Sequence, residues 1–271
     1  MVAQFRKIQP EDAQGVLMSF LVWSALYICI ANSPLPLKPK AANLKYLDDL
    51  DVRNRLVSFA HGFLIMSLAA YEFYFQPGSC GDATTQYEKN LIYISVGYFL
   101  YDFLAMSYYG LLDFAMTFHH GICIVGMMLG VTSGQGGNFI VQGMYIAEVS
   151  NTCMHLRVIL KHYGLRYTKA YESMEISFIL LYIYGRILLG LSVVYGCVTC
   201  PKVLVIIKVC SAGLLFQSIH FIFKMVGILK RRFAEISLRK RHRVKSRWFD
   251  PLTPEEMAKI GLKGTKEKHI L

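Results

Sequence analysis

Residues 113–132, DFAMTFHHGICIVGMMLGVT, form an apolar run that two adjacent histidines interrupt. The run has the length of roughly 20 residues that an α-helix needs to cross the hydrocarbon core of a bilayer. His119 and His120 stand where a lipid-facing helix carries leucine or isoleucine. The stretch therefore predicts a membrane-spanning helix with a polar face that is turned away from lipid.

The composition of the whole chain supports this interpretation. Of the 271 residues, 54% are hydrophobic and 17% are charged, and the mean hydropathy is +0.38. Ordinary soluble domains have about 25% charged residues. The balance therefore excludes an ordinary soluble domain and favours a multi-pass membrane protein.

Seven segments of the chain approach the length of a membrane span. We predict an all-α bundle of about seven transmembrane helices, with spans at 13–33, 56–76, 91–111, 113–132, 138–160, 175–197 and 202–229. Very short links join the third span to the fourth and the fourth to the fifth, so these spans are antiparallel neighbours. We divide the chain into an N-terminal segment with the first span and a surface linker (1–44), a transmembrane domain (45–230) and a basic C-terminal tail (231–271).

Basic residues are distributed unevenly between the two ends of this bundle. With seven crossings, the N-terminal end receives Arg6, Lys7, Lys89 and Lys202, and the opposite end receives the other loop lysines and arginines and the whole tail. Cytoplasmic loops carry an excess of lysine and arginine. We therefore predict an N-terminus on the outer or lumenal side and a C-terminus in the cytosol or matrix.

Three stretches outside the spans have recognisable character. The linker KPKAANLKYLDDLDVRNR (38–55) predicts an amphipathic helix on the membrane surface. The block KRRFAEISLRKRHRVKSR (230–247) follows an apolar span directly, so we predict contact with anionic lipid head groups and no nucleic-acid partner. Thr253 to Glu256 match a capping box with proline at the first helical position, and Gly261 predicts where the short surface helix stops.

Three cysteines fall at the outer side of the predicted bundle. Cys197 and Cys200 have CxxC spacing, but no second pair or histidine accompanies them as a zinc site requires. A disulfide that involves Cys80 is one interpretation, because the lumen is oxidising. The sequence favours the other interpretation, in which these are ordinary small apolar residues at a helix end.

Ionisable side chains inside the spans carry the functional prediction. A charge at the bilayer centre costs roughly 2.5–3.5 kcal/mol on insertion scales, so each one needs a partner, a wet cavity or a role. Two polar stripes follow the helical spacing, one on the fourth span and one on the fifth: Asp113, Thr117 and His120, and Glu148, Asn151, Thr152 and His155. We expect the stripes to face each other, since neither can face lipid.

These stripes predict a polar cavity that opens toward the cytosol or matrix and is closed at the outer side. Its candidate lipid-binding residues are His61, Asp102, Asp113, His120, Glu148, Arg157 and Arg186. The alternative is a set of satisfied hydrogen bonds and ion pairs between helices. We expect no metal and no cofactor, because adjacent histidines on a helix point apart and no HxxxH or HExxH spacing occurs. A histidine beside carboxylates suits general-base or acyl-transfer chemistry, proton relay or head-group binding.

Several short motifs resemble the TRAM–LAG–CLN8 (TLC) domain of multi-pass membrane proteins. They are Asn54-Arg55-Leu-Val-Ser58-Phe-Ala-His61, Tyr101-Asp102, Asp113 through His119-His120, and Ala147-Glu148-Val-Ser150-Asn151 with Arg157. Their order and spacing hold over roughly residues 45–230. The resemblance implies a helical membrane fold and a role in lipid handling or membrane composition.

The best-known enzymes of that family are ceramide synthases, which transfer a fatty acyl group from acyl-CoA to a sphingoid amine. The resemblance implies that His119 and His120 match the catalytic histidine pair, and that Glu148 and Asn151 stand where the family has two aspartates. Asn151 removes a negative charge that would support an imidazolium. The chain therefore is more similar to the TLC-domain-containing branch than to ceramide synthases proper.

Three functions follow, in order of preference. The first is the binding or handling of a lipid (an acyl chain, a sphingolipid or a phospholipid) in the intramembrane cavity. The second is a catalytically silent accessory subunit of a larger membrane complex, such as a mitochondrial respiratory assembly, with other membrane-protein subunits as partners. The third is an acyl-CoA-dependent N-acyltransferase that uses His119, His120, Glu148 and Asn151. We expect location in the endoplasmic reticulum or another endomembrane, with the mitochondrial inner membrane as the alternative.

Overall fold

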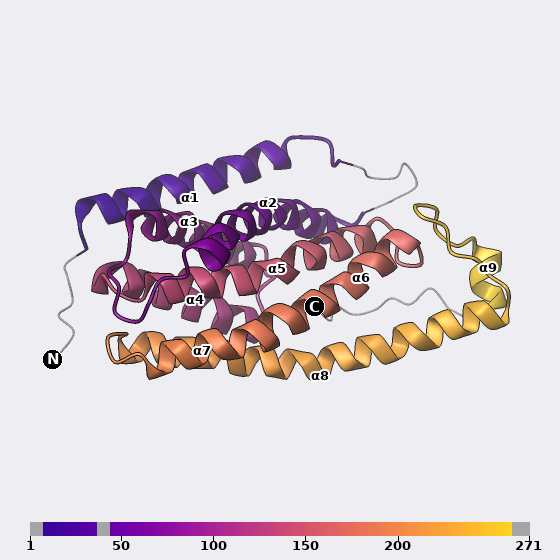
Figure 1. The fold of residues 1–271 in the computed structure, drawn as a ribbon. Coiled ribbons are helices and arrows are strands. Elements are labelled where there is room, and N and C mark those ends of the chain that lie inside the picture. Colours follow the sequence, from indigo (N-terminus) through magenta and orange to yellow (C-terminus); the bar gives the residue numbers. More distant parts are fainter. Residues whose placement is uncertain (1–7, 37–43, 262–271) are drawn as a thin grey trace.

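The computed structural model describes residues 8–36 and 44–261, and their regular structure is helical (Figure 1). The elements, in chain order, are α1 (Pro10–Ala31), α2 (Tyr46–Phe75), α3 (Gln86–Tyr108), α4 (Phe114–Ser133), α5 (Gly137–His162), α6 (Lys169–Tyr182), the π-helix η1 (Ile183–Leu189), α7 (Gly190–Thr199), α8 (Val205–Arg241) and α9 (Pro254–Lys259). The predicted all-α, multi-pass bundle is confirmed.

Long helical rods run back and forth along one axis. Helix α6, η1 and α7 continue one another as a single rod, so α1 to α8 make seven passes, and α1 begins at the end opposite to where α8 finishes (Figure 1). The connections α3–α4 and α4–α5 are short, and both helix pairs contact each other as expected. We call the end that holds the Cys80–Cys200 bridge the disulfide end, and the opposite end, where α8 finishes at Arg241, the basic end.

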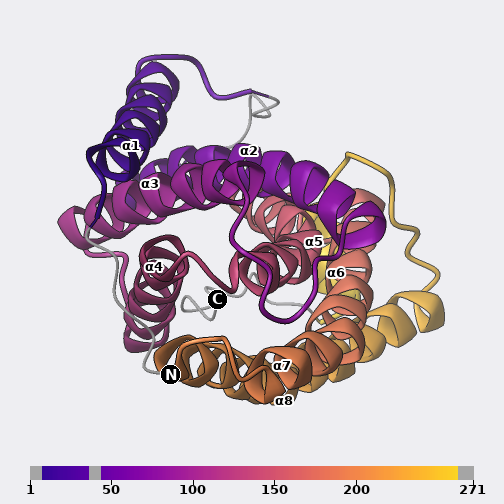
Figure 2. The same ribbon diagram turned by 60° about the vertical axis from the view of Figure 1, so that its left-hand side comes forward.

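Six of these rods in the described residues are long and apolar enough to cross a membrane: α1, α2, α3, α4, the α6–α7 rod and α8. Helix α5, which corresponds to the fifth predicted span, is 26 residues long, but it is not among the helices that are apolar enough to cross a membrane. It lies inside the bundle and contacts α2, α3, α4, α6, η1 and α7 (Figure 2). Because other helices surround α5, its polar side chains do not need to face lipid.

Helix α2 begins at Tyr46, so a separate surface helix over 38–55 is wrong for its described part. Two ion pairs at i,i+4 spacing, Arg53 with Asp49 and Arg55 with Asp51, balance the charges of this stretch within one helix. His162 at the end of α5 contacts the same Asp51 at 2.8 Å. These contacts allow the helix to start well before the apolar residues begin. Residues 38–43 of the predicted surface helix lie outside the described residues.

Helix α8 does not end at 229 but continues to Arg241. Its 37 residues make it about 55 Å long, nearly twice the thickness of a bilayer core. The extension is held by ion pairs with α6, in which Arg232 contacts Glu175 and Arg239 contacts Glu172. The first part of the basic block is therefore a rigid extension of the bundle, and the boundary predicted at 230 falls inside a helix.

The short helix predicted near the C-terminus is present as α9. The Thr253 hydroxyl accepts from the backbone N–H of Glu256, and the Thr253 backbone N–H donates to the Glu256 carboxylate. This donation and the nearby Arg247 guanidinium hold the pKa of Glu256 below its ordinary value. Gly261 follows the helix with φ of 67°, a left-handed conformation that glycine adopts without strain.

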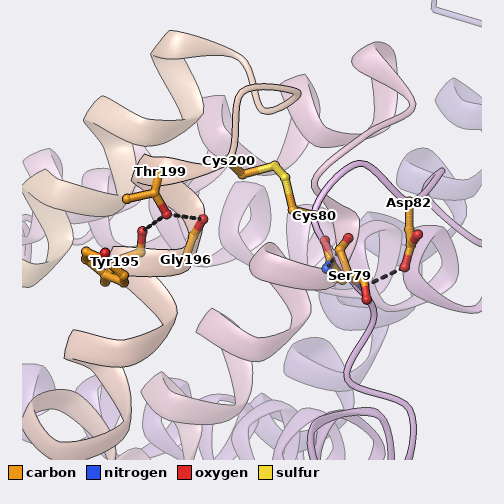
Figure 3. Close-up of a disulfide and its surroundings, with 8 residues drawn as sticks. Ser79, Cys80, Asp82, Tyr195, Gly196, Thr199 and Cys200 are labelled. Carbon is orange, nitrogen blue, oxygen red and sulfur yellow. Dashed lines mark hydrogen bonds between the residues drawn. A yellow bond between two sulfur atoms is a disulfide. The ribbon is translucent and has the colours of Figure 1, made fainter.

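A disulfide joins Cys80 in the α2–α3 connection to Cys200 in the α7–α8 connection, with Cα atoms 5.6 Å apart (Figure 3). The favoured interpretation of these cysteines as ordinary apolar residues is wrong for this pair. Cys197, three residues before Cys200, keeps a free and buried thiol. The bridge fixes two connections that are distant in sequence to the same end of the bundle.

Candidate functional site

A cavity of about 150 Å³ lies between α4, α5, the η1–α7 part of the sixth rod and α8, with α2 and α3 behind it. Along α8 its lining runs from Ile207 to Ser218, which is about 16 Å at the helical rise of 1.5 Å per residue. Most of the lining is apolar. A long apolar cavity with a few polar groups is the usual form of a small-ligand site.

The part of the cavity nearest the disulfide end is apolar. Its lining there includes Phe139, Ile140, Val194, Cys197 and Ile207. Two of these residues also belong to the buried cluster that packs beneath the bridge, whose members are Cys197, Cys200, Val203 and Ile207. The bridge therefore lies next to the apolar end of the cavity.

Four ionisable side chains line the cavity farther from the disulfide end. They come from four different elements: His61 from α2, His119 from α4, Glu148 from α5 and Arg186 from η1. His61 is almost fully buried and stacks on the ring of Tyr98 with centroids 3.8 Å apart. Four helical elements thus each bring one ionisable side chain to the same space. Of the residues predicted to bind lipid, His61, Glu148 and Arg186 line it.

Arg186 is presented by the π-helical turn of the sixth rod. Such turns are rare and are frequent at functional sites. The adjacent Gly185 allows η1 to lie directly against α5, because a Cβ at this position would be 2.8 Å from the carbonyl oxygen of Ile146. The wider turn therefore places the guanidinium at the cavity while keeping the two helices in close contact.

The hydrogen bonds of Arg186 are long and incomplete. Nη1 donates to the Ser218 hydroxyl at 3.5 Å and Nη2 donates to the Ala147 carbonyl at 3.4 Å. Nε is buried and has no hydrogen-bond partner among the described residues. Within the same residues no carboxylate lies at ion-pair distance from this guanidinium. Arg186 is therefore a cation with unused donor capacity at the cavity wall.

Glu148 is buried and accepts a hydrogen bond from Asn151 at 3.2 Å. Its carboxylate lies against Gly62 of α2, where a Cβ would come within 2.8 Å of Oε2. In the described part of the chain it forms no ion pair. Asn151 does not line the cavity, so its role here is to orient the carboxylate that does.

His120 lies outside the cavity lining, in contrast to its neighbour His119. Its Nε2 lies 2.8 Å from Asp102 and its Nδ1 lies 2.9 Å from the Met116 carbonyl. Asp102 in turn accepts from the Asn54 amide at 2.6 Å, and the Tyr101 hydroxyl donates to the Asn54 carbonyl oxygen at 2.7 Å. The placement of His120 and Asp102 at the ligand is therefore corrected: both belong to a buried chain that joins α2, α3 and α4.

A family model matches the central part of the chain. The TLC domain (TRAM, LAG1, CLN8) matches residues 51–226, which include all four ionisable residues of the cavity. The chain belongs to the TLC domain family. The TLC match ends before the basic extension of α8, so that extension and α9 lie outside the family's common domain.

Two further residues predicted for the site lie elsewhere in the TLC bundle. Asp113 is an exposed N-cap of α4 and accepts from the backbone N–H of Met116 at 2.8 Å. Arg157 contacts Glu175 at 3.3 Å at the basic end. Neither residue lines the cavity. Asp113 caps the start of α4, and Arg157 belongs to the ion cluster between α5, α6 and α8.

Sequence reasoning missed most of the cavity lining, and two of the missed residues matter for the chemistry and for tests. Cys123 lies one helical turn after His119, and its Sγ is 3.7 Å from His119 Nε2. Gly143 lines the cavity and has open space where a Cβ would be. The i,i+4 spacing between His119 and Cys123 is the sequence signal from which Cys123 could have been predicted. In residues 8–36 and 44–261 there is no group of three or more metal-ligating side chains.

Proposed function

We propose that this TLC-domain protein binds one membrane lipid in the cavity. An acyl chain lies along the apolar part near Phe139 and Ile207, and the head group lies at Arg186, Glu148 and His119. The observation that carries the proposal is the division of one cavity into an apolar part and a part where four ionisable side chains converge. An amphipathic ligand matches that division, because its apolar tail contacts the apolar lining and its polar head group contacts the ionisable side chains.

The two charged residues support a particular kind of head group. The guanidinium of Arg186, with its unpartnered Nε, matches a phosphate or carboxylate oxygen. Among the described residues, Glu148 accepts one hydrogen bond, from Asn151, and its carboxylate matches a donor such as an ammonium, a hydroxyl or an amide. A head group that has both an acceptor and a donor, as phospholipids and sphingolipids do, therefore fits better than a free fatty acid.

The orientation proposed from the basic residues gains support from the disulfide. Disulfides persist in oxidising compartments, which supports our proposal that the disulfide end faces the lumen or an equivalent space. The cytoplasmic side attracts the lysines and arginines of the basic end, where anionic lipids also gather. Two independent signals thus favour an endomembrane location with the C-terminal part of α8 in the cytosol.

The test is lipid retention by protein purified in a mild detergent, measured by native mass spectrometry and by lipid extraction. Gly143→Leu fills the cavity at a position where the backbone has room, so we expect this variant to lose the lipid that the wild type retains. Gly121→Leu is the matched control, because Gly121 also has open space around it but lies on the exposed face of α4. Equal retention by wild type and Gly143→Leu would contradict the proposal.

A second variant tests the head group. Arg186→Gln keeps a hydrogen-bonding side chain but removes the charge, so we expect the retained lipid to shift away from phosphate-bearing classes. An unchanged distribution of lipid classes would remove Arg186 from the proposed site while leaving the apolar part in place.

A further inference from the structure

A thiol and an imidazole lie together in the wall of the cavity. Cys123 Sγ is 3.7 Å from His119 Nε2, a distance at which the thiol donates to an unprotonated ring nitrogen. The two residues stand at i and i+4 on α4, so one turn of a well-formed helix fixes their contact. Both line the cavity between α4, α5, α7 and α8.

This arrangement distinguishes Cys123 from the other thiols. Free cysteines in the described residues are Cys29, Cys123, Cys153, Cys197 and Cys210. Three of them line the cavity, but Cys123 is the one in this part of the chain whose sulfur contacts an imidazole. A cysteine beside a base is the usual form of an activated nucleophile.

We propose that Cys123 is an acyl-acceptor site, at which the thiol takes an acyl group from an acyl thioester. His119 is the general base, because both ring nitrogens of its neighbour His120 already have partners in Asp102 and Met116. The inference rests on the proposed function, since the acyl chain of the donor occupies the same apolar cavity.

The step is a thioester exchange, and its atoms balance without an oxidant or reductant. The Cys123 sulfur attacks the carbonyl carbon of the donor thioester while His119 Nε2 takes the thiol proton. The bond between that carbon and the donor sulfur then breaks, and the proton on His119 passes to the leaving sulfur. The products are a thioester on Cys123 and a free thiol, with the charge on the carbonyl oxygen stabilised by the Arg186 guanidinium of the same lining.

The experiment uses full-length protein in lipid nanodiscs and palmitoyl-CoA that carries a terminal alkyne. We expect a label at Cys123, mapped by peptide mass spectrometry and released by neutral hydroxylamine, which cleaves thioesters. Cys123→Ser should abolish the hydroxylamine-sensitive label on the peptide that contains residue 123. His119→Gln should lower the initial labelling rate about 100-fold, the size of a lost general base.

Matched variants separate this reaction from non-specific acylation. Cys153→Ser and His220→Gln remove a thiol on α5 and an imidazole on α8 that do not line the cavity, so we expect wild-type labelling from both. Acylation of the exposed Cys29 should be independent of His119. Equal rates in wild type and His119→Gln, or a label that maps only to Cys29, would overturn the inference.

Retained lipid is measured in the same preparations, so that the two proposals fail separately. If wild type retains lipid but Cys123 stays unlabelled, the acyl-acceptor site is excluded and the lipid-binding proposal stands. If Cys123→Ser retains lipid and loses the label, both stand. If wild type has neither lipid nor label, both are wrong.

Discussion

The Nε2 atom of His120 lies 2.8 Å from Oδ2 of Asp102, and both side chains are buried between α3 and α4. The Met116 carbonyl can only accept, so the Nδ1 atom of His120 carries a proton. The contact with Asp102 therefore holds one more proton, either on the imidazole or on the carboxyl. Every polar atom of the pair is satisfied, which explains how an ionisable residue is tolerated at this depth.

The first prediction concerns this pair. Asp102→Ala leaves His120 and the Asn54 amide without their buried acceptor, and we expect a loss of roughly 3 kcal/mol in unfolding free energy, as for other broken buried pairs. His120→Ala should cost a similar amount, and the double variant less than the sum, because the two side chains act as a unit. Denaturant unfolding in detergent micelles measures all three. Asp250→Ala, at an exposed position, is the control and should change stability little. If the double variant lost the full sum of the two single losses, the pairing of His120 with Asp102 would be contradicted.

Much of the architecture follows from the sequence, because membrane helices need long apolar runs and intramembrane charges need partners. The helical spacing also separates His119 from His120 by about 100°. It does not say which of the two faces the cavity, since that depends on how α4 is rotated against α3. The extension of α8 and the early start of α2 could not be predicted from hydropathy, because ion pairs with other elements decide them. Nothing in the stretch IYGRILL (183–189) marks it as a π-helix.

The second prediction tests that π-helix. Gly185→Ala places a Cβ 2.8 Å from the Ile146 carbonyl oxygen, which is backbone and cannot move aside easily. We expect a loss of about 1–3 kcal/mol, the usual result of overpacking, together with weaker lipid retention because Arg186 is displaced. Gly227→Ala on α8, where a Cβ meets nothing within 4 Å, is the matched control and should be neutral or slightly stabilising. Thermal unfolding and native mass spectrometry report the two effects. Equal stability of both variants would show that the close approach of η1 to α5 is absent.

The third prediction concerns the bridge between Cys80 and Cys200. It closes a loop of 120 residues, for which the chain-entropy model gives about 4–5 kcal/mol of stabilisation. Cys200→Ser should therefore lower the unfolding temperature, and reductant should lower the wild-type value to that of the variant. Cys29→Ser removes a free exposed thiol and serves as the control. A reductant effect that persists in Cys200→Ser would contradict this assignment.

The fourth prediction is a pH dependence at α9. The folded-state pKa of Glu256 is lowered by the Thr253 backbone N–H and by Arg247, so its contribution to α9 is fully present above the ordinary glutamate pKa of about 4.3. It is lost as the pH falls through the lower folded-state value. Hydrogen exchange of the α9 amides, corrected for intrinsic rates, should become faster over that range. In Glu256→Gln this acid-induced step should be absent, whereas Glu255→Gln should retain it.

The last prediction concerns the ion cluster that joins the basic extension of α8 to the TLC bundle. Glu175 of α6 is buried and contacts Arg232 of α8 and Arg157 of α5 through different carboxylate oxygens. Glu175→Gln removes the charge that both guanidinium groups share, and since Arg232 keeps its contact with Glu235 we expect a loss of about 3 kcal/mol.

The extension beyond residue 229 keeps the contacts of Arg239 with Glu172 and of Glu235 with Arg166, so the same variant should loosen its first turns around Arg232 before the membrane-embedded part unfolds. Limited trypsin digestion should then cleave after Arg231 or Arg232 faster than in wild type, at unchanged lipid retention. Glu255→Gln on the exposed face of α9 is the charge-matched control and should leave cleavage unchanged. Equal cleavage rates in Glu175→Gln and wild type would mean that the cluster does not hold the extension, and that another contact orders α8 at the basic end.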